Sequence, residues 1–195
     1  TKGLIEKYGK ERVIETPISE AGFTGIAVGA AMTGMRPIIE YMYSDFSIVA
    51  MDQIINQAAK MSLMTGGQAK VPLVIRHSTG ICNHGAQHSQ CLEAYFSHTP
   101  GLKVIAPATP YDAKGLLKSA IRDDNPVVVF EHKYLYGAKA VGGARKTVFD
   151  TLSKIGTDVP DEDYLVPIGK ADIKREGTDV TIISTLLMLY KSLMA

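Results

Sequence analysis

The feature that most constrains this fold is the alternation of short apolar runs with helical patterns from Arg36 to Glu131. Val71–Arg76 and Val127–Phe130 are rich in β-branched residues and have the length of buried parallel strands. Tyr111–Arg122, which follows Pro110, has helical spacing of its apolar residues. Such alternation indicates βαβ units. It predicts an α/β fold with a doubly wound, mainly parallel sheet and helices on both faces.

Further segments complete the predicted sheet and its helices. Arg36–Tyr41 and Leu102–Ala106 are expected to be strands. Ser47–Thr65 has apolar residues at i, i+3 and i+4 spacing and is expected to be one long helix, and His88–His98 is expected to be another. In parallel sheets, ligands bind beyond the carboxyl ends of the strands. The segments that follow the strands are therefore expected to form the site: Glu40–Phe46, His77–His88 and Glu131–Tyr136.

Composition excludes several classes of partner. The formal net charge of the 195 residues is +1 and no basic stripe is present, so we expect no nucleic acid partner. No apolar run approaches the ~20 residues that cross a bilayer, so we expect no membrane span. Cys82 and Cys91 form no disulfide framework, and no Cys/His spacing matches a zinc site.

The chain changes character after its first two-thirds. We predict a first domain over 1–137, a linker over 138–163 and the start of a second α/β domain over 164–195. The linker is rich in glycine and acidic residues, and Asp179–Ser184 is expected to be a strand of the second domain. There is no starting Met, and a helix opens at Leu186–Ala195, so we expect a fragment of a longer protein.

The segment Glu15–Gly29 places a carboxyl group at the start of an apolar helix. Ser19 is expected to cap this helix, and the helix dipole favours the nearby Glu20 carboxylate. Gly25, Gly29 and Thr33 then recur at every fourth residue, which places small residues on one face and allows another backbone to approach. The alternative is an ordinary capped and tightly packed helix.

This segment, T-P-I-S-E-A-G-F-T-G-I-A-V-G-A-A, resembles the beta subunits of thiamine-diphosphate-dependent 2-oxo acid dehydrogenases. These are the decarboxylating components of the pyruvate, branched-chain and acetoin dehydrogenase complexes. The resemblance extends from about Gly3 to about Ser184. Five other anchors carry it: Glu40–Phe46, Met51–Lys60, Gly85–Gln90, His98–Pro107 and Asp112–Val127.

The resemblance implies that residues 1–137 are a transketolase-like pyrimidine-binding domain and assigns roles to several of them. Glu20 would reach ring nitrogen N1′ of the cofactor's aminopyrimidine, and Phe46 with Met42 would contact the cofactor. His88 would transfer protons at the reacting centre, for which an ordinary imidazole pKa is suitable. The alternative for Tyr41, Tyr43 and Phe46 is that they are ordinary core aromatics.

The resemblance also raises the question of metals. In some family members, potassium is bound at the positions of Leu73, Ala120, Ile121, Asp123 and Asn125. A helix end closed by acidic residues is the alternative reading of these positions. His84 precedes His88 by four residues, as in an i, i+4 metal pair, but no third ligand follows at useful spacing.

A motif that the chain lacks points to a partner. No G-D-G segment followed by paired asparagines is present, and in the family that element holds magnesium and the diphosphate. The resemblance therefore implies an alpha subunit in an alpha2beta2 heterotetramer, with a second beta subunit and a lipoyl acyltransferase as further partners. The chain would act on a 2-oxo acid such as pyruvate. The alternatives are an acetoin dehydrogenase beta subunit and a non-catalytic structural subunit.

The resemblance leaves the compartment dependent on the organism. It would be the cytoplasm in a bacterium and the mitochondrial matrix or plastid in a eukaryote.

Overall fold

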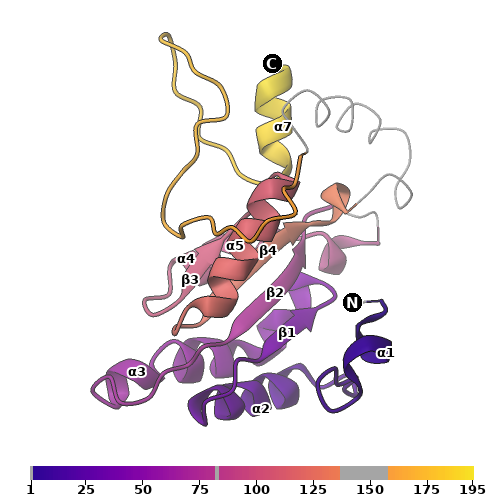
Figure 1. The fold of residues 1–195 in the computed structure, drawn as a ribbon, viewed down its shortest axis with the longest axis vertical. Coiled ribbons are helices and arrows are strands. Elements are labelled where there is room, and N and C mark those ends of the chain that lie inside the picture. The colour runs from indigo at the N-terminus through magenta and orange to yellow at the C-terminus, as the bar shows by residue number, and fades with distance from the viewer. Residues whose placement is uncertain (1, 82–83, 137–157) are drawn as a thin grey trace.

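A four-stranded parallel sheet forms the centre of the computed structural model, which describes residues 2–81, 84–136 and 158–195 (Figure 1). The strand order is β1-β2-β4-β3, and every neighbouring pair is parallel. The strands are β1 (Ile38–Tyr41), β2 (Val74–Thr79), β3 (Lys103–Ile105) and β4 (Val127–His132). The predicted parallel α/β sheet is confirmed, with boundaries shifted by a few residues.

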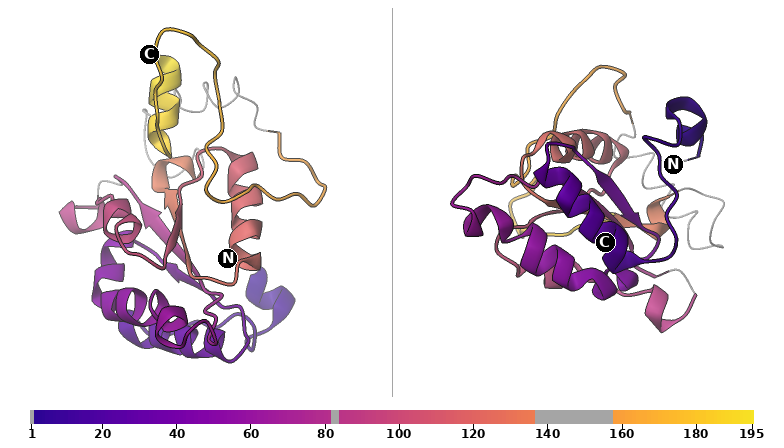
Figure 2. Two further views of the ribbon diagram at one scale, coloured as in Figure 1. Left: turned by 90° about the vertical axis from the view of Figure 1, so that its left-hand side faces the viewer. Right: turned by 90° about the horizontal axis from the view of Figure 1, so that it is seen from below.

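Helices cover both faces of the sheet, as predicted. One face packs in a core with the helical segments α2 (Glu20–Met32), η1 (Ser44–Ala50), η2 (Asp52–Ala58) and α4 (Glu93–Ser97). The other face packs against α5 (Pro110–Arg122). Figure 2 (left) shows the strands between α5 on one side and the purple and magenta helical segments on the other.

The order of the strands explains this division. From β1 through β2 to β3 the chain moves in one direction across the sheet, and it then returns to insert β4 beside β2. Right-handed crossovers place the connecting helices on one face for the first direction and on the opposite face for the return. The reversal makes the carboxyl edge of β2 and β4 the natural position for a site.

The predicted long helix over Ser47–Thr65 is wrong in detail. Its residues form the 3₁₀ segment η1, the π-helical segment η2 and the short α3 (Met61–Met64). Apolar spacing of three and four residues fits all these windings, so the pattern does not fix the hydrogen bonding. Inside η1, the Ser47 hydroxyl donates to the Ser44 carbonyl at 2.6 Å, a local bond that competes with regular helix formation.

The predicted helix over His88–His98 also divides. Ala86–His88 form the 3₁₀ turn η3, and only Glu93–Ser97 form α4. The loop after α4 then passes very close to the end of η2. A Cβ at Gly101, whose φ is +101°, would lie 1.9 Å from the Ala59 carbonyl oxygen, so only glycine fits there.

The last described segment lies over α5 and contains no strand. The Ser119 hydroxyl donates to the Val166 carbonyl at 2.6 Å, and the rings of Tyr111 and Tyr164 stack at 4.4 Å. Asp179–Ser184 is not a strand, which corrects the prediction, because no neighbouring strand pairs with it in the described part of the chain. The assignment of 164–195 to a second domain stays a prediction.

The two ends of the chain carry short helices. At the C-terminus α7 (Leu187–Met194) forms as expected, and at the N-terminus α1 (Leu4–Tyr8) ends at Gly9. Most of the predicted linker, 138–157, lies outside the described residues.

Candidate functional site

Two aromatic rings enclose His88 at the carboxyl edge of the sheet. Tyr43 and Phe46 follow the end of β1, and η3 brings His88 to them. The His88 ring meets both edge to face, with centroids 4.7 Å from Tyr43 and 5.2 Å from Phe46. The structure therefore joins Phe46 and His88, two residues that are 42 positions apart (88 − 46) in the chain.

Tyr43 connects this ring cluster to further polar groups. Its hydroxyl lies 2.9 Å from Nδ1 of His84, and the ammonium of Lys133 lies 4.9 Å from its ring centroid. Lys133 is buried, and its Nζ donates to the Ser78 carbonyl at 3.2 Å. Tyr43 is thus part of the candidate site. Lys133, which follows β4, is a member that the sequence argument did not single out.

Glu20 is the first residue of α2 and is half-buried. The expected Ser19 cap is wrong. The Ser19 hydroxyl donates to the Pro17 carbonyl at 3.2 Å instead, and it makes no capping bond to α2. The backbone of Ser19 explains the missing cap, because its ψ of 67° is not that of the extended backbone typical of a capping serine.

The charge of Glu20 acts on Tyr41 at the end of β1. The pKa of the Tyr41 hydroxyl is raised to about 12, mainly by burial. A hydrogen bond with Thr24 lowers this pKa, and the charge of the Glu20 carboxylate raises it further. Tyr41 is fully enclosed, with its ring centroid 5.0 Å from that of His77 and 5.3 Å from that of Phe23. It is therefore a core residue, as the alternative for Tyr41 held, and Glu20 is close enough for its charge to act on it.

Met42 points away from the core. Met42 is 76% exposed, so it is available for contact with a cofactor and does not pack within this chain.

The small-residue face of α2 is in contact with this chain at one glycine and open at another. A Cβ at Gly25 would lie 3.3 Å from Oε1 of Gln53, whereas a Cβ at Gly29 would meet nothing within 4 Å. Packing of this face against a second helix stays a prediction.

The potassium candidates lie at the opposite edge of the sheet, around the starts of β2 and β4: Leu73, Ala120, Ile121, Asp123 and Asn125. The guanidinium of Arg36 already lies among them. It donates to the carbonyls of Ile121 at 2.8 Å and Asp123 at 2.7 Å. Although burial raises it, hydrogen bonds from Lys103 and Asn125 hold the pKa of the Asp123 carboxyl below its ordinary value.

These contacts leave little room for a further cation. A potassium ion on the same carbonyls would face the charge of Arg36 at short range, and like charges repel strongly where water is partly excluded. Binding would require the Arg36 side chain to move. The potassium site stays a prediction. The described residues contain no cluster of three or more His, Cys, Asp or Glu side chains placed to hold a metal.

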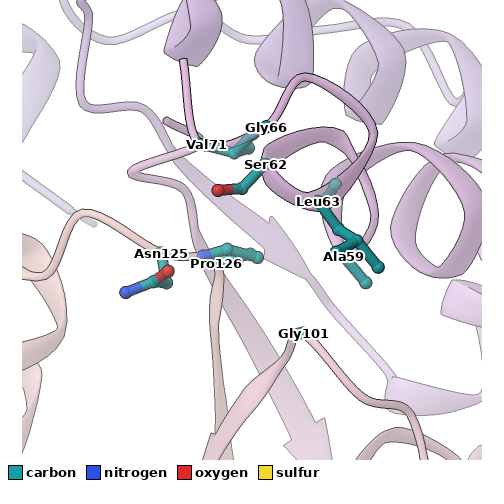
Figure 3. A pocket seen from close by; sticks show the side chains of 10 residues that line it. Ala59, Ser62, Leu63, Gly66, Val71, Gly101, Asn125 and Pro126 are labelled. Carbon is teal, nitrogen blue, oxygen red and sulfur yellow. The ribbon is translucent and has the colours of Figure 1, made fainter. Parts of the chain in front are cut away.

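A cavity of about 400 Å³ lies at this same amino edge, between α3 and the segments that lead into the strands (Figure 3). Its walls include Ser62, Leu63, Val71, Asn125 and Pro126. None of its lining residues is titratable, and it lies at the other end of the strands from His88. The cavity therefore does not supply acid–base chemistry.

A buried histidine lies beneath the carboxyl edge. His77 in β2 is fully enclosed by the rings of Tyr41, Phe96 and Phe130. Its two ring nitrogens have no hydrogen-bond partner among the described residues. Burial lowers the pKa of His77 to about 3, so it is neutral at ordinary pH and belongs to the core.

The fold and these groups define a class of protein: a parallel α/β domain with a half-buried carboxylate and a ring-enclosed histidine at the strand ends. No helix in the described residues is both long and apolar enough to span a bilayer. Residues 1–139 match the family model described as "Transketolase, pyrimidine binding domain". The chain belongs to this family.

Curated relatives carry the comparison further. The chain is 50% identical over 196 residues to pyruvate dehydrogenase E1 component subunit beta-2, mitochondrial, of Oryza sativa subsp. japonica. It is 50% identical to the Bos taurus and 53% identical to the Dictyostelium discoideum mitochondrial beta subunits, over 94% of its own length in each case. It spans about half of these relatives: 49%, 48% and 48% of their lengths.

Among solved structures, one named "Split gene transketolase, inactive beta4 tetramer" has a similar fold. The TM-score is 0.56 with 22% sequence identity, covering 68% of this chain and 41% of that one. At this identity the likeness concerns the fold alone.

Proposed function

We propose that this chain is the pyrimidine-binding part of a beta subunit of a pyruvate-type 2-oxo acid dehydrogenase. The observation that carries the proposal is its identity of about 50% with pyruvate dehydrogenase beta subunits along 94–100% of its own length. The ring cluster around His88 supports it, because such a sheet binds ligands beyond its strand ends, and the charge of Glu20 acts on Tyr41 at the end of β1.

The residues present fit thiamine diphosphate, the cofactor that we propose. Its aminopyrimidine requires an aromatic contact and a carboxyl group. Phe46 is a half-buried ring at the end of β1, and Glu20 is a half-buried carboxyl at the start of α2. When bound, the cofactor would supply a nucleophilic carbon. Phe46 would hold the pyrimidine ring, and Glu20 would share a proton with its ring nitrogen.

His88 would move protons near the substrate carbonyl. Its ring is half-buried between Tyr43 and Phe46, which fixes its plane without enclosing it completely. An imidazole ring has one nitrogen that can donate a proton and one that can accept it. We assign Tyr43 to the support of His88, and Tyr41 to the core.

A partner subunit would complete the site. The sequence has no motif for magnesium and diphosphate, so an alpha subunit would supply both, in an alpha2beta2 assembly with a second beta subunit. The acyl group would pass to a lipoyl acyltransferase. The similar proteins are named mitochondrial, and for a eukaryotic source we propose the mitochondrial matrix.

An acetoin dehydrogenase beta subunit is the second candidate. The segments Glu131–Gly137 and Pro107–Leu117 motivate it, because the resemblance there leans toward acetoin-type or bacterial 2-oxo acid members. Pyruvate and acetoin, offered separately to the assembled enzyme with a lipoylated acceptor, distinguish the two. Faster acyl transfer from acetoin would replace the first proposal with the second.

Glu20→Gln tests the proposed chemistry in a full-length beta subunit assembled with its alpha partner. Removal of the positioned carboxyl is expected to lower the turnover of pyruvate by about 10²–10⁴-fold, the usual effect of losing an acid–base group. Glu15→Gln is the matched control, because Glu15 is an exposed carboxyl five residues earlier (20 − 15). Turnover of Glu20→Gln within twofold of wild type would remove Glu20 from the mechanism.

A further inference from the structure

The segment that carries His88 has little regular structure of its own. η3 is a single 3₁₀ turn, and the chain from Ser89 to Leu92 contains neither helix nor strand. A side chain on such a segment keeps one orientation only when the surrounding residues are fixed by packing and hydrogen bonds. One such fixed point lies two residues after His88, at Gln90.

Gln90 is hydrogen-bonded to two other parts of the fold. Its carbonyl accepts from the Gly80 N–H at 3.2 Å and from the Thr79 hydroxyl at 3.2 Å, both at the end of β2. The Ser44 hydroxyl, in η1, lies 3.4 Å from the same carbonyl. The backbone N–H and the side-chain Nε2 of Gln90 both donate to Oδ1 of Asp45, at 3.2 Å and 2.8 Å.

Asp45 lies directly before Phe46 in the first turn of η1 and is 6% exposed. The same turn therefore touches the His88 segment at two points. Phe46 contacts the His88 ring, and Asp45 holds Gln90. Two contacts on one short, buried turn fix both the distance and the direction of His88 relative to Phe46.

We propose that Asp45 is a positioning residue that holds His88 against Phe46 through its hydrogen bonds to Gln90. The inference rests on the proposed function in one respect, the catalytic role of His88. The positioning itself follows from the contacts and has its own readout.

The hydrogen bonds to Gln90 depend on one oxygen of Asp45, Oδ1. Both donors of Gln90 converge on Oδ1, while Oδ2 of Asp45 is buried and makes no hydrogen bond within the described residues. An asparagine at this position retains a carbonyl oxygen that can replace Oδ1. An alanine removes the acceptor of both Gln90 donors, so the connection between η1 and the His88 segment is lost.

The experiment compares Asp45→Ala with Asp45→Asn in the full-length beta subunit assembled with its alpha partner. Two properties are measured: kcat and KM for pyruvate, and the rate at which diethyl pyrocarbonate modifies His88, followed by peptide mass spectrometry. His98, which is exposed, serves as the internal reference for reagent reactivity. The matched control is Asp112→Ala, because Asp112 is an equally buried carboxyl on the opposite face of the sheet.

Asp45→Ala is expected to lower kcat by about 10- to 100-fold with little change in KM, as a displaced catalytic group does. The modification of His88 relative to His98 is expected to rise by about threefold or more, since a loosened ring is more accessible. Asp45→Asn is expected to restore both values to near wild type. Asp112→Ala is expected to lower the melting temperature without changing the reactivity of His88.

Unchanged reactivity of His88 in Asp45→Ala would overturn the proposal, as would an equal rise in Asp112→Ala. If Asp45→Ala fails to assemble, Gln90→Ala removes only the 2.8 Å bond and is expected to produce a smaller rise. No rise in that variant would also refute the inference. A rise in reactivity in an enzyme that never turns over pyruvate would leave the positioning intact and contradict the proposed function instead.

Discussion

His77 is the residue whose environment most clearly limits its chemistry. It is surrounded by three aromatic rings, and neither ring nitrogen has a partner among the described residues. A buried polar atom without a hydrogen bond costs about 1–3 kcal/mol. The sequence places this histidine in a loop at the edge of the site, whereas the structure extends β2 through it and turns its side chain into the core.

We therefore expect His77→Phe to raise the free energy of unfolding at pH 7 by about 1 kcal/mol, because it removes the unpaired nitrogens while retaining a ring. The change is measured by urea unfolding. His98→Phe is the control at an exposed position and is expected to stay within about 0.5 kcal/mol of wild type. A loss of stability in His77→Phe would show that the imidazole nitrogens do have partners.

The same variant has a distinct pH dependence. The unfolded chain protonates His77 near pH 6.5, but burial lowers its folded pKa to about 3. Protons therefore favour the unfolded state as the pH falls below 6.5, and this loss ends only below the folded pKa. His77→Phe is expected to remove a slope of about 1.4 kcal/mol per pH unit between these values. An unchanged slope would place the acid sensitivity elsewhere, for instance at His132, whose pKa burial lowers to about 4.

At the scale of single residues, the sequence predicts those whose position follows from a strand end. Phe46 and His88 follow separate strands and meet, as the rule for parallel sheets implies. The contact between Asp45 and Gln90 is not predictable in this way, although each residue belongs to a recognised motif. Their bond joins residues 45 positions apart and depends on the 3₁₀ winding of η1, which side-chain spacing does not reveal.

Among the elements, α5 shows the closest agreement between sequence and structure. It begins at Pro110, as predicted, and Thr109 caps it. The Thr109 side chain accepts a bond from the Asp112 N–H at 3.1 Å, and its hydroxyl lies 2.7 Å from Oδ2 of Asp112. Such local signals suffice because cap, proline and helix are neighbours in the chain.

Thr109→Ala is accordingly expected to lower the free energy of unfolding by about 1–2 kcal/mol through loss of the cap. Thr109→Ser is the matched control, since it retains the hydroxyl, and it is expected to recover most of the loss. Urea unfolding of the three chains provides the comparison. Equal losses in both variants would assign the effect to packing of the Thr109 methyl group rather than to the cap.

Where the elements depart from prediction, the missing information is non-local. The segment from Ser47 to Thr65 has helical spacing, yet its winding changes twice where it packs into the core with α2 and β2. Asp179–Ser184 has strand-forming residues but no strand beside it in the described part of the chain. Spacing and propensity specify which side a segment buries, and the hydrogen-bonding partner then decides the type of element.

At the scale of the whole molecule, the distribution of groups around the sheet bears on the proposed partnership. The rings of Tyr43 and Phe46 and the imidazole of His88 lie together after the strand ends, and we propose that they and Glu20 face the pyrimidine and the reacting carbon. No cluster for a divalent metal occurs in the described residues, and the sequence contains no diphosphate motif. On the proposed function, the groups on this chain would therefore contact the pyrimidine half of the cofactor.

We accordingly expect this chain, when studied alone, not to bind thiamine diphosphate at micromolar concentrations. A diphosphate is held mainly by cations and by backbone N–H groups aimed at it. One aromatic contact and one carboxyl contact contribute only a few kcal/mol, and about 4 kcal/mol corresponds to a millimolar dissociation constant. Isothermal titration with thiamine diphosphate and magnesium is expected to show no heat of binding until an alpha-type partner is added to the full-length beta subunit.

Thiamine lacking the diphosphate is the matched ligand control, and it is expected to bind the lone chain as weakly as the whole cofactor does. Micromolar binding of thiamine diphosphate to the lone chain, but not of thiamine, would mean that this chain holds the diphosphate itself, and the shared site would have to be abandoned.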